Sequence, residues 1–178
     1  MKEETFDALR SSMQDFRLPR YEQIPSIGLY LEQVTKFISE YTEPLGEGTL
    51  TGSMVSNYVK KGLISSPVKK QYSRDQLAHL MFIALAKSIL SLDDLQKFIR
   101  IQQRTYAVGT AYNYFCQELE TALRAVFDPH GEPPQAKPYH GDEKTILRNI
   151  VITVAHKIYL EKYISAVTEE MENAPAEA

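Results

Sequence analysis

The sequence of 178 residues has one cysteine and four histidines, too few for a disulfide framework or a zinc site. Cys116 has no partner for an internal disulfide, which fits a reducing compartment. The histidines are scattered and do not follow the spacing of a zinc ligand set; they are residues 79, 130, 140 and 156. We therefore expect no metal site.

Long apolar runs and catalytic motifs are also missing. No stretch approaches the roughly 20 apolar residues that a membrane-spanning helix needs. The first residues, MKEETFDALRSS, are polar and acidic and do not resemble a signal peptide. No glycine-rich phosphate loop, nucleophile motif or catalytic carboxylate–histidine spacing is found. We expect a cytoplasmic protein that is not an enzyme, has no cofactor and does not enter membranes.

Negative charge is missing from one segment, although the net charge is −3. Residues 1–49 carry 5 basic and 9 acidic side chains, and residues 75–178 carry 10 and 14. Residues 50–74 contain no acid, and their five cations are Lys60, Lys61, Lys69, Lys70 and Arg74. Such a window is typical of a DNA contact surface within an acidic protein. A solvated face that happens to lack acids is equally compatible with the charge alone.

The apolar periodicity predicts a mainly α protein that starts with a short helix over residues 2–14. Pro19 and Pro25 make residues 18–26 an extended connector, so residues 1–25 form an N-terminal helix and connector. Ser26 is then expected to cap a helix whose apolar positions lie between residues 31 and 41.

A second, shorter helix follows a glycine turn. Thr51 is placed to cap a helix that ends at Lys61, and Gly62 stands where a positive φ is needed. Residues 63–72 contain two β-prone pairs around Ser-Ser-Pro, which predicts a small hairpin. Ser73 and Gln76 form a capping box that opens the next helix. Ser91 repeats this device, and the helical pattern continues to about residue 104.

The last third of the sequence predicts two long helices. These are residues 105–127 and 143–171, and the proline-rich segment 128–142 separates them. Helix 143–171 is apolar over most of its circumference, so it must bury more than one face. We therefore expect residues 105–171 to form a dimerisation or effector region, followed by a disordered tail over residues 172–178. Four aromatic residues of this region pack in the core or line a small-molecule pocket: Tyr106, Tyr112, Tyr114 and Phe115.

The segment from Thr49 to Phe98 resembles the DNA-binding domain of the MerR family of transcription regulators. The resemblance lies in Asn-Tyr-Val-Lys-Lys-Gly-Leu-Ile at residues 57–64, Pro67, and Tyr-Ser-Arg-Asp-Gln-Leu at residues 72–77. Leu80, Phe-Ile at 82–83 and Ile-Leu-Ser-Leu-Asp-Asp-Leu at 89–95 follow in the same order. The resemblance implies a winged helix-turn-helix over residues 26–104, with a β-hairpin wing at residues 63–72 and additional C-terminal helices.

A closer resemblance is to a bacterial domain-of-unknown-function family, number eighteen thirty-six in its series. Its pattern is found here at residues 18–22, 29–34, 54–64 and 67–74. The sequence departs from the MerR pattern, because Ser56 stands where that family usually has Arg. The segment expected to form the wing is also shorter and lacks the Gly-Tyr-Arg tip, and no cysteines occupy metal-sensing positions, so the effector side of that family does not transfer.

These features predict a transcriptional regulator that binds double-stranded DNA as a homodimer through its C-terminal helices. Short polar side chains on helix 51–61 would read bases, and lysines would contact phosphates. The expected DNA-binding residues are Thr51, Ser53, Ser56, Asn57, Lys60, Lys61, Lys69, Lys70 and Arg74. The alternative is a winged-helix module that binds another protein. A small-molecule effector is possible, but no motif supports it.

Overall fold

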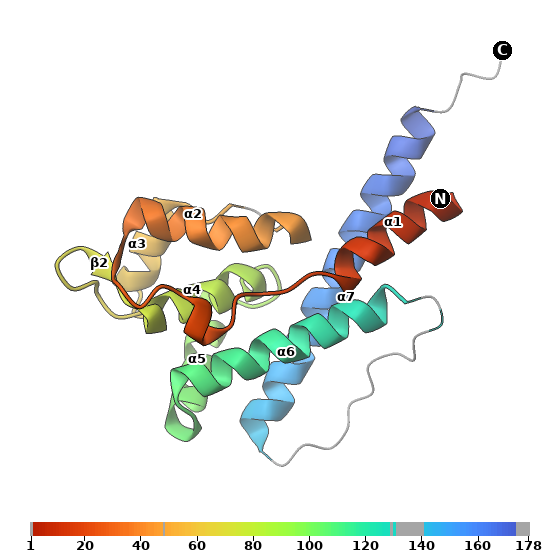
Figure 1. The fold of residues 1–178 in the computed structure, drawn as a ribbon. Helices are drawn as coiled ribbons and strands as arrows, with labels where there is room; N and C mark the ends of the chain where they lie inside the picture. Colours follow the sequence, from red (N-terminus) through yellow and green to blue (C-terminus); the bar gives the residue numbers. More distant parts are fainter. Residues whose placement is uncertain (1, 48, 129, 131–140, 174–178) are drawn as a thin grey trace.

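The computed structural model describes residues 2–47, 49–128, 130 and 141–173, and it is mainly helical (Figure 1). Its helices are α1 (Glu3–Gln14), α2 (Leu31–Thr42), α3 (Gly52–Lys60), α4 (Arg74–Ala86), α5 (Leu92–Thr105), α6 (Val108–Val126) and α7 (Asp142–Glu172). Two 3-10 turns, η1 (Tyr21–Gln23) and η2 (Glu43–Leu45), flank α2. The strands β1 (Leu29–Tyr30) and β2 (Gln71–Tyr72) complete the described elements.

Helix α4 lies at the centre of the hydrophobic core. Ten of its 13 residues are buried, and it contacts α2, α6 and α7. Because neighbours surround it, α4 is apolar on nearly every side, as expected for a core helix. The capping box predicted at its start is present: Ser73 N–H donates to Gln76 Oε1 at 2.7 Å, and Gln76 N–H donates to Ser73 Oγ at 3.4 Å.

The connector before α2 packs on the domain through its apolar residues. Leu18 and Ile24 are buried. The guanidinium of Arg20 donates to both carboxylate oxygens of Glu120 in α6, each at 2.7 Å, and Leu18 N–H donates to Glu120 Oε1 at 3.0 Å. These bonds hold the N-terminal connector on α6 through a residue at least 100 positions later in the chain.

The small sheet differs from the predicted hairpin. Leu29 pairs with Tyr72 and Tyr30 with Gln71, so β2 pairs with the segment before α2 and not with residues 63–64. Leu63 and Ile64 are buried as loop residues. The prediction that Ser26 caps α2 was also wrong, because pairing in β1 delays the helix until Leu31.

Helix α3 follows α2 through η2 and residues 46–51, and its predicted ends are confirmed. Thr51 Oγ1 accepts from Met54 N–H at 3.3 Å. Gly62 has φ +71°, and the N–H of Leu63 donates to the carbonyl of Tyr58 at 2.9 Å, which closes a Schellman motif. Gly46 also has positive φ in the predicted glycine turn, whereas Gly48 lies outside the described residues.

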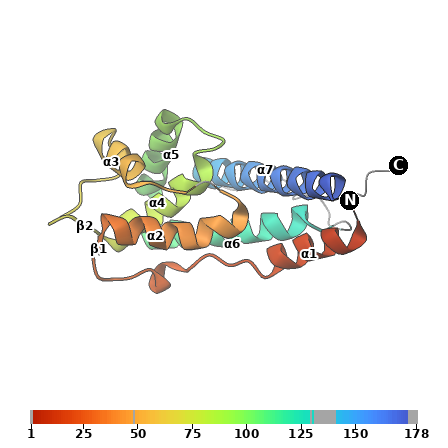
Figure 2. The ribbon, with the colours of Figure 1, turned by 90° about the horizontal axis from the view of Figure 1, so that it is seen from above.

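Helices α6 and α7 pack against each other along the side of the core (Figures 1 and 2). They confirm the two long helices predicted for this region, although α6 begins at Val108 and α7 continues to Glu172, one residue into the predicted tail. The first half of α7 is buried at positions such as Ile150, Val154 and Ile158. The second half carries exposed apolar side chains, and residues 174–178 lie outside the described part.

Candidate nucleic-acid interface

The outer face of α3 is polar and open to solvent. Its exposed residues are Ser53, Ser56, Asn57 and Lys60, and the neighbouring Thr51 and Lys61 are exposed as well. Val55 and Tyr58 are buried on the opposite face, and Met54 and Val59 pack against the core. The helical spacing of three and four residues therefore separates a polar face from an apolar one.

Two contacts fix the position of α3. At its start, Gly52 lies against Leu31 of α2, and a Cβ at this position would be 3.1 Å from Leu31 Cδ2. At its end, Gln96 of α5 donates to the carbonyls of Lys61 and Gly62 at 2.8 and 3.0 Å. The orientation of the polar face thus depends on helices before and after it in the sequence.

Lys69 and Lys70 form the tip of a two-residue turn, which we call the lysine turn (residues 68–71). Val68 N–H donates to Gln71 O at 3.1 Å, and Gln71 N–H donates to Val68 O at 2.9 Å. The φ angles are +50° at Lys69 and +65° at Lys70. A turn with positive φ at both central positions normally carries Asn-Gly or Asp-Gly, because a side chain there is strained.

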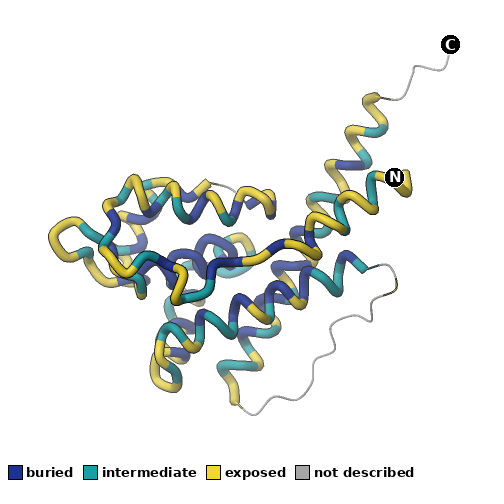
Figure 3. The backbone as a smooth tube through the Cα atoms, in the orientation of Figure 1, coloured by how far each residue is buried: buried dark blue, intermediate teal, exposed yellow. Residues whose placement is uncertain are grey.

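The lysine turn and α3 lie at the same end of the molecule, away from the two chain termini (Figures 1 and 2). The lysine turn is mostly exposed, and α3 has four exposed residues on its outer face (Figure 3). An open groove beside the turn is lined by Tyr30, Pro67, Lys70 and Tyr72, and Glu32 of α2 also lines it. The acid-free segment therefore brings its four lysines to one end of the fold, with Glu32 as a nearby acid.

Arg74 differs from the other expected contact residues. Its Nε donates to the carbonyl of Ile24 at 2.9 Å, and its guanidinium lies 5.3 Å from the centre of the Tyr21 ring. The Tyr21 hydroxyl in turn donates to Asp75 at 2.5 Å. Through these contacts Arg74 holds the connector against the start of α4.

Sequence reasoning missed the role of Gln96 and the conformation of the lysine turn. Gln96 lies 34 residues after Gly62, and no local motif links them. A Lys-Lys pair carries no turn signal, because neither residue favours positive φ. The turn is closed by the isolated bridge between Val68 and Gln71, and β2 continues from Gln71 to pair with β1.

The chain belongs to the family described as Domain of unknown function (DUF1836), whose model matches residues 19–115. The match begins in the connector and ends inside α6, so it includes α3 and the lysine turn. Comparison with curated proteins and with solved structures gave no match. Within the described ranges, no helix is both long and apolar enough to cross a membrane. The same ranges contain no cluster of His, Cys, Asp and Glu that could hold a metal ion.

Proposed function

We propose that the chain is a DNA-binding transcriptional regulator with a MerR-like winged helix-turn-helix. In this proposal α2 and α3 form the helix-turn-helix, α3 is the recognition helix, and the lysine turn is the tip of the wing. The antiparallel pair β1–β2 supports a wing, because it joins the strand before α2 to the strand that follows the turn.

The observation that carries the proposal is the strained pair Lys69–Lys70. Left-handed φ costs an L residue about 1 kcal/mol or more, and backbone strain of this kind collects at functional sites. Glycine or asparagine would relieve it at either position. The two lysines place two exposed cations on a short hairpin, which suits a contact with phosphates.

On α3, Asn57 is the best candidate for reading a base, since an amide can form two hydrogen bonds with adenine. Ser53 and Ser56 share its face. Lys60 and Lys61 end the helix and are expected to bind phosphates. The serine at position 56 and the short turn predict modest affinity for one copy, which favours binding as a pair.

The double variant Lys69→Asn/Lys70→Gly tests the proposal, because it removes both charges and suits the turn better. Fluorescence anisotropy with a random duplex at low salt should show affinity reduced at least tenfold and a salt slope smaller by about two. The variant Lys2→Gln/Lys162→Gln, which removes the same charge from the residue before α1 and from α7, should bind like the wild type. Equal binding by the wild type and the turn variant would refute the proposal.

A protein-interaction module is the second candidate, and exposed apolar side chains near the turn favour it. Val68 is 75% exposed and Ile27 is 73% exposed. Docking through such residues should respond little to salt, whereas phosphate binding must weaken as salt rises. A partner retained at high salt and lost on Val68→Asp would favour this second function.

We also propose a homodimer through the second half of α7. Leu160, Ile164 and Met171 are 57%, 62% and 73% exposed, and with Val167 they follow a spacing of four, three and four residues. Such an apolar stripe on a helix is typical of a helix-pairing surface. Pairing would present two recognition helices to DNA, as two-fold symmetric operators require.

A further inference from the structure

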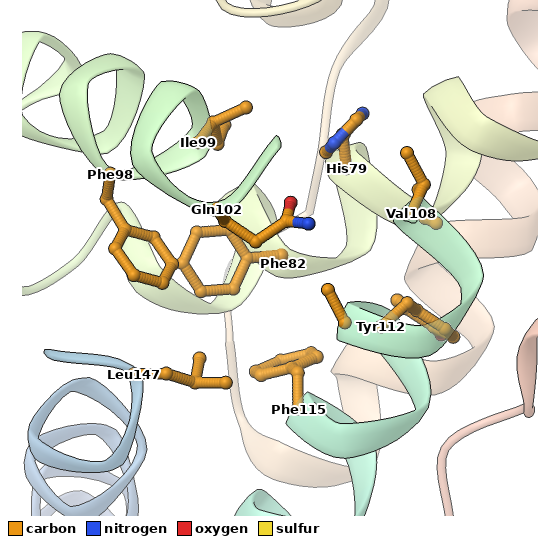
Figure 4. A pocket seen from close by; sticks show the side chains of 11 residues that line it. His79, Phe82, Phe98, Ile99, Gln102, Val108, Tyr112, Phe115 and Leu147 are labelled. Carbon is orange, nitrogen blue, oxygen red and sulfur yellow. The ribbon is translucent and has the colours of Figure 1, made fainter. Parts of the chain in front are cut away.

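Two adjoining cavities lie where α4, α5, α6 and α7 meet. One has a volume of about 40 Å³ and the other of about 130 Å³. They share Phe98, Gln102, Ala111 and Leu147 in their walls. Figure 4 shows the smaller cavity, with Leu147 of α7 facing the aromatic rings of α4, α5 and α6.

The walls suit one flat apolar ring. Phe82, Phe98 and Phe115 pack with ring centres 5.3 and 5.5 Å apart along one side. Together the two cavities are about as large as an engineered cavity of about 150 Å³ that binds benzene. Polar groups that could hold water are few in the walls, so an organic ring would be the better occupant.

A cation stands at the border of the larger cavity. Lys144 Nζ lies 5.7 Å from the ring centre of Tyr106 and 5.7 Å from that of Tyr114. Both rings hold the ammonium group in place through cation–π attraction. The neighbouring Glu143 also lines the cavity, but its carboxylate is turned toward Gly141, where a Cβ would be 2.9 Å from Glu143 Oε1.

The polar side chain in the shared wall, Gln102, is also held in place. Gln102 is buried, and its Nε2 donates to the carbonyl of Tyr106 at 3.1 Å, which joins the end of α5 to the segment before α6. The amide therefore stands at the junction of the two cavities in a fixed position. A ligand would meet an apolar interior with the Lys144 ammonium group at its edge, where Glu143 also lies with its carboxylate beside Gly141.

We propose that these cavities form a binding site for a small monocyclic aromatic acid. The ring would lie among Phe98, Ala111 and Leu147, and the carboxylate would pair with the Lys144 ammonium group. An aromatic cation fits less well, because it would compete with Lys144 for the faces of Tyr106 and Tyr114. This site is separate from α3 and the lysine turn, so it does not depend on the proposed DNA binding.

Benzoate is the probe for a first test, with binding followed by NMR of the methyl groups of Ala111 and Leu147. We expect saturable chemical-shift changes for the methyl groups of both residues. The variant Ala111→Leu should abolish the shift of Leu147 by filling the shared wall. Thr110→Phe, at an exposed position on the rim of the larger cavity, should do the same without altering the core. Thermal unfolding of both variants establishes that they fold.

The charge is tested separately with Lys144→Gln. This change should weaken benzoate about tenfold, the effect of losing one charge-assisted bond, and leave benzyl alcohol unaffected. Lys162→Gln, a lysine elsewhere on α7, should bind benzoate like the wild type. Absence of saturable shifts at about 10 mM benzoate, a concentration that reaches weak affinities, would overturn the site. Tighter binding of benzylamine than of benzoate would overturn the assignment of an acid.

Discussion

The side-chain amide of Gln96 in α5 closes the end of α3 by donating to the carbonyl of Gly62 at 3.0 Å and to that of Lys61 at 2.8 Å. The last carbonyls of a helix have no partner within the helix. Here a side chain from a later helix supplies one, and the space above Gly62 is small enough that a Cβ would lie 3.2 Å from Gln96 Nε2.

Replacing Gln96 with alanine should loosen α3 without unfolding the protein. We expect the free energy of unfolding to fall by about 1 kcal/mol, the usual worth of such hydrogen bonds at a partly exposed site. Amide exchange at Lys61, Gly62 and Leu63 should quicken. Urea unfolding and hydrogen exchange measure both effects. Gln117→Ala, an exposed glutamine on α6, is the matched control, and an equal loss in the control would contradict the prediction.

The variant Lys69→Asn/Lys70→Gly should be more stable than the wild type. Relief of two left-handed lysines is expected to raise the free energy of unfolding by about 1 to 2 kcal/mol. Urea unfolding should therefore show a higher midpoint with an unchanged slope. A lower midpoint would mean that the turn is not strained by its lysines.

The pairing of Arg20 with Glu120 should be the main polar contribution to docking of the connector. Glu120 is 3% exposed and Arg20 is 36% exposed at the side chain. Glu120→Gln keeps the shape but removes the charge, and we expect a loss of about 2 kcal/mol. The loss is smaller than for a fully buried pair because water can reach Arg20. Glu118→Gln on the same helix should leave the urea midpoint unchanged.

Stability should decrease as the pH falls below neutrality, in part because of His79. Burial lowers the pKa of His79 below its ordinary value of 6.5, and the nearby Asp75 opposes this shift. In the unfolded chain the imidazole takes up a proton near pH 6.5, whereas in the folded chain it does so at lower pH. Stabilisation by His79 is therefore complete above pH 6.5 and is lost as the pH falls through the interval below it.

The variant His79→Gln should reduce this dependence. Urea unfolding between pH 7.5 and 5.5 would show a shallower loss of stability than in the wild type. His156→Gln replaces an exposed histidine and should keep the wild-type slope. Identical slopes in all three proteins would remove His79 as a cause.

Charges placed on the exposed stripe of α7 should separate the proposed dimer. We expect Leu160→Glu/Ile164→Glu to sediment as a monomer at tens of micromolar, where the wild type sediments as a dimer. Asn149→Glu/Thr153→Glu adds the same charge on exposed positions of the first half of α7 and should remain dimeric. A wild-type monomer under these conditions would rule out the dimer.

Local sequence signals determined the helices and most of their ends. Thr51, Ser73 and Ser91 cap the helices that they were predicted to cap. Gly62 has the positive φ expected after α3. Each of these features depends on partners within about five residues, so the chain encodes them without knowledge of the fold. The polar face of α3 was predictable for the same reason.

Tertiary structure decided where these elements lie. The sheet joins Leu29 to Tyr72, and the predicted cap Ser26 failed because that pairing shifted the start of α2. Arg74, one of the expected DNA-binding residues, holds the connector through a hydrogen bond to the carbonyl of Ile24. Such contacts join residues tens of positions apart, and no local pattern reveals which of many distant partners closes the loop.

The acid-free segment, residues 50–74, shows both what the local sequence determines and what the tertiary structure decides. Its composition by itself determined that five cations stand together in an acidic chain. Packing decided which of them are free to meet a ligand: Lys60, Lys61, Lys69 and Lys70 are exposed, and Arg74 is engaged. The physical reason is that charge is a property of the residue, whereas exposure and backbone strain depend on what the rest of the fold places beside it.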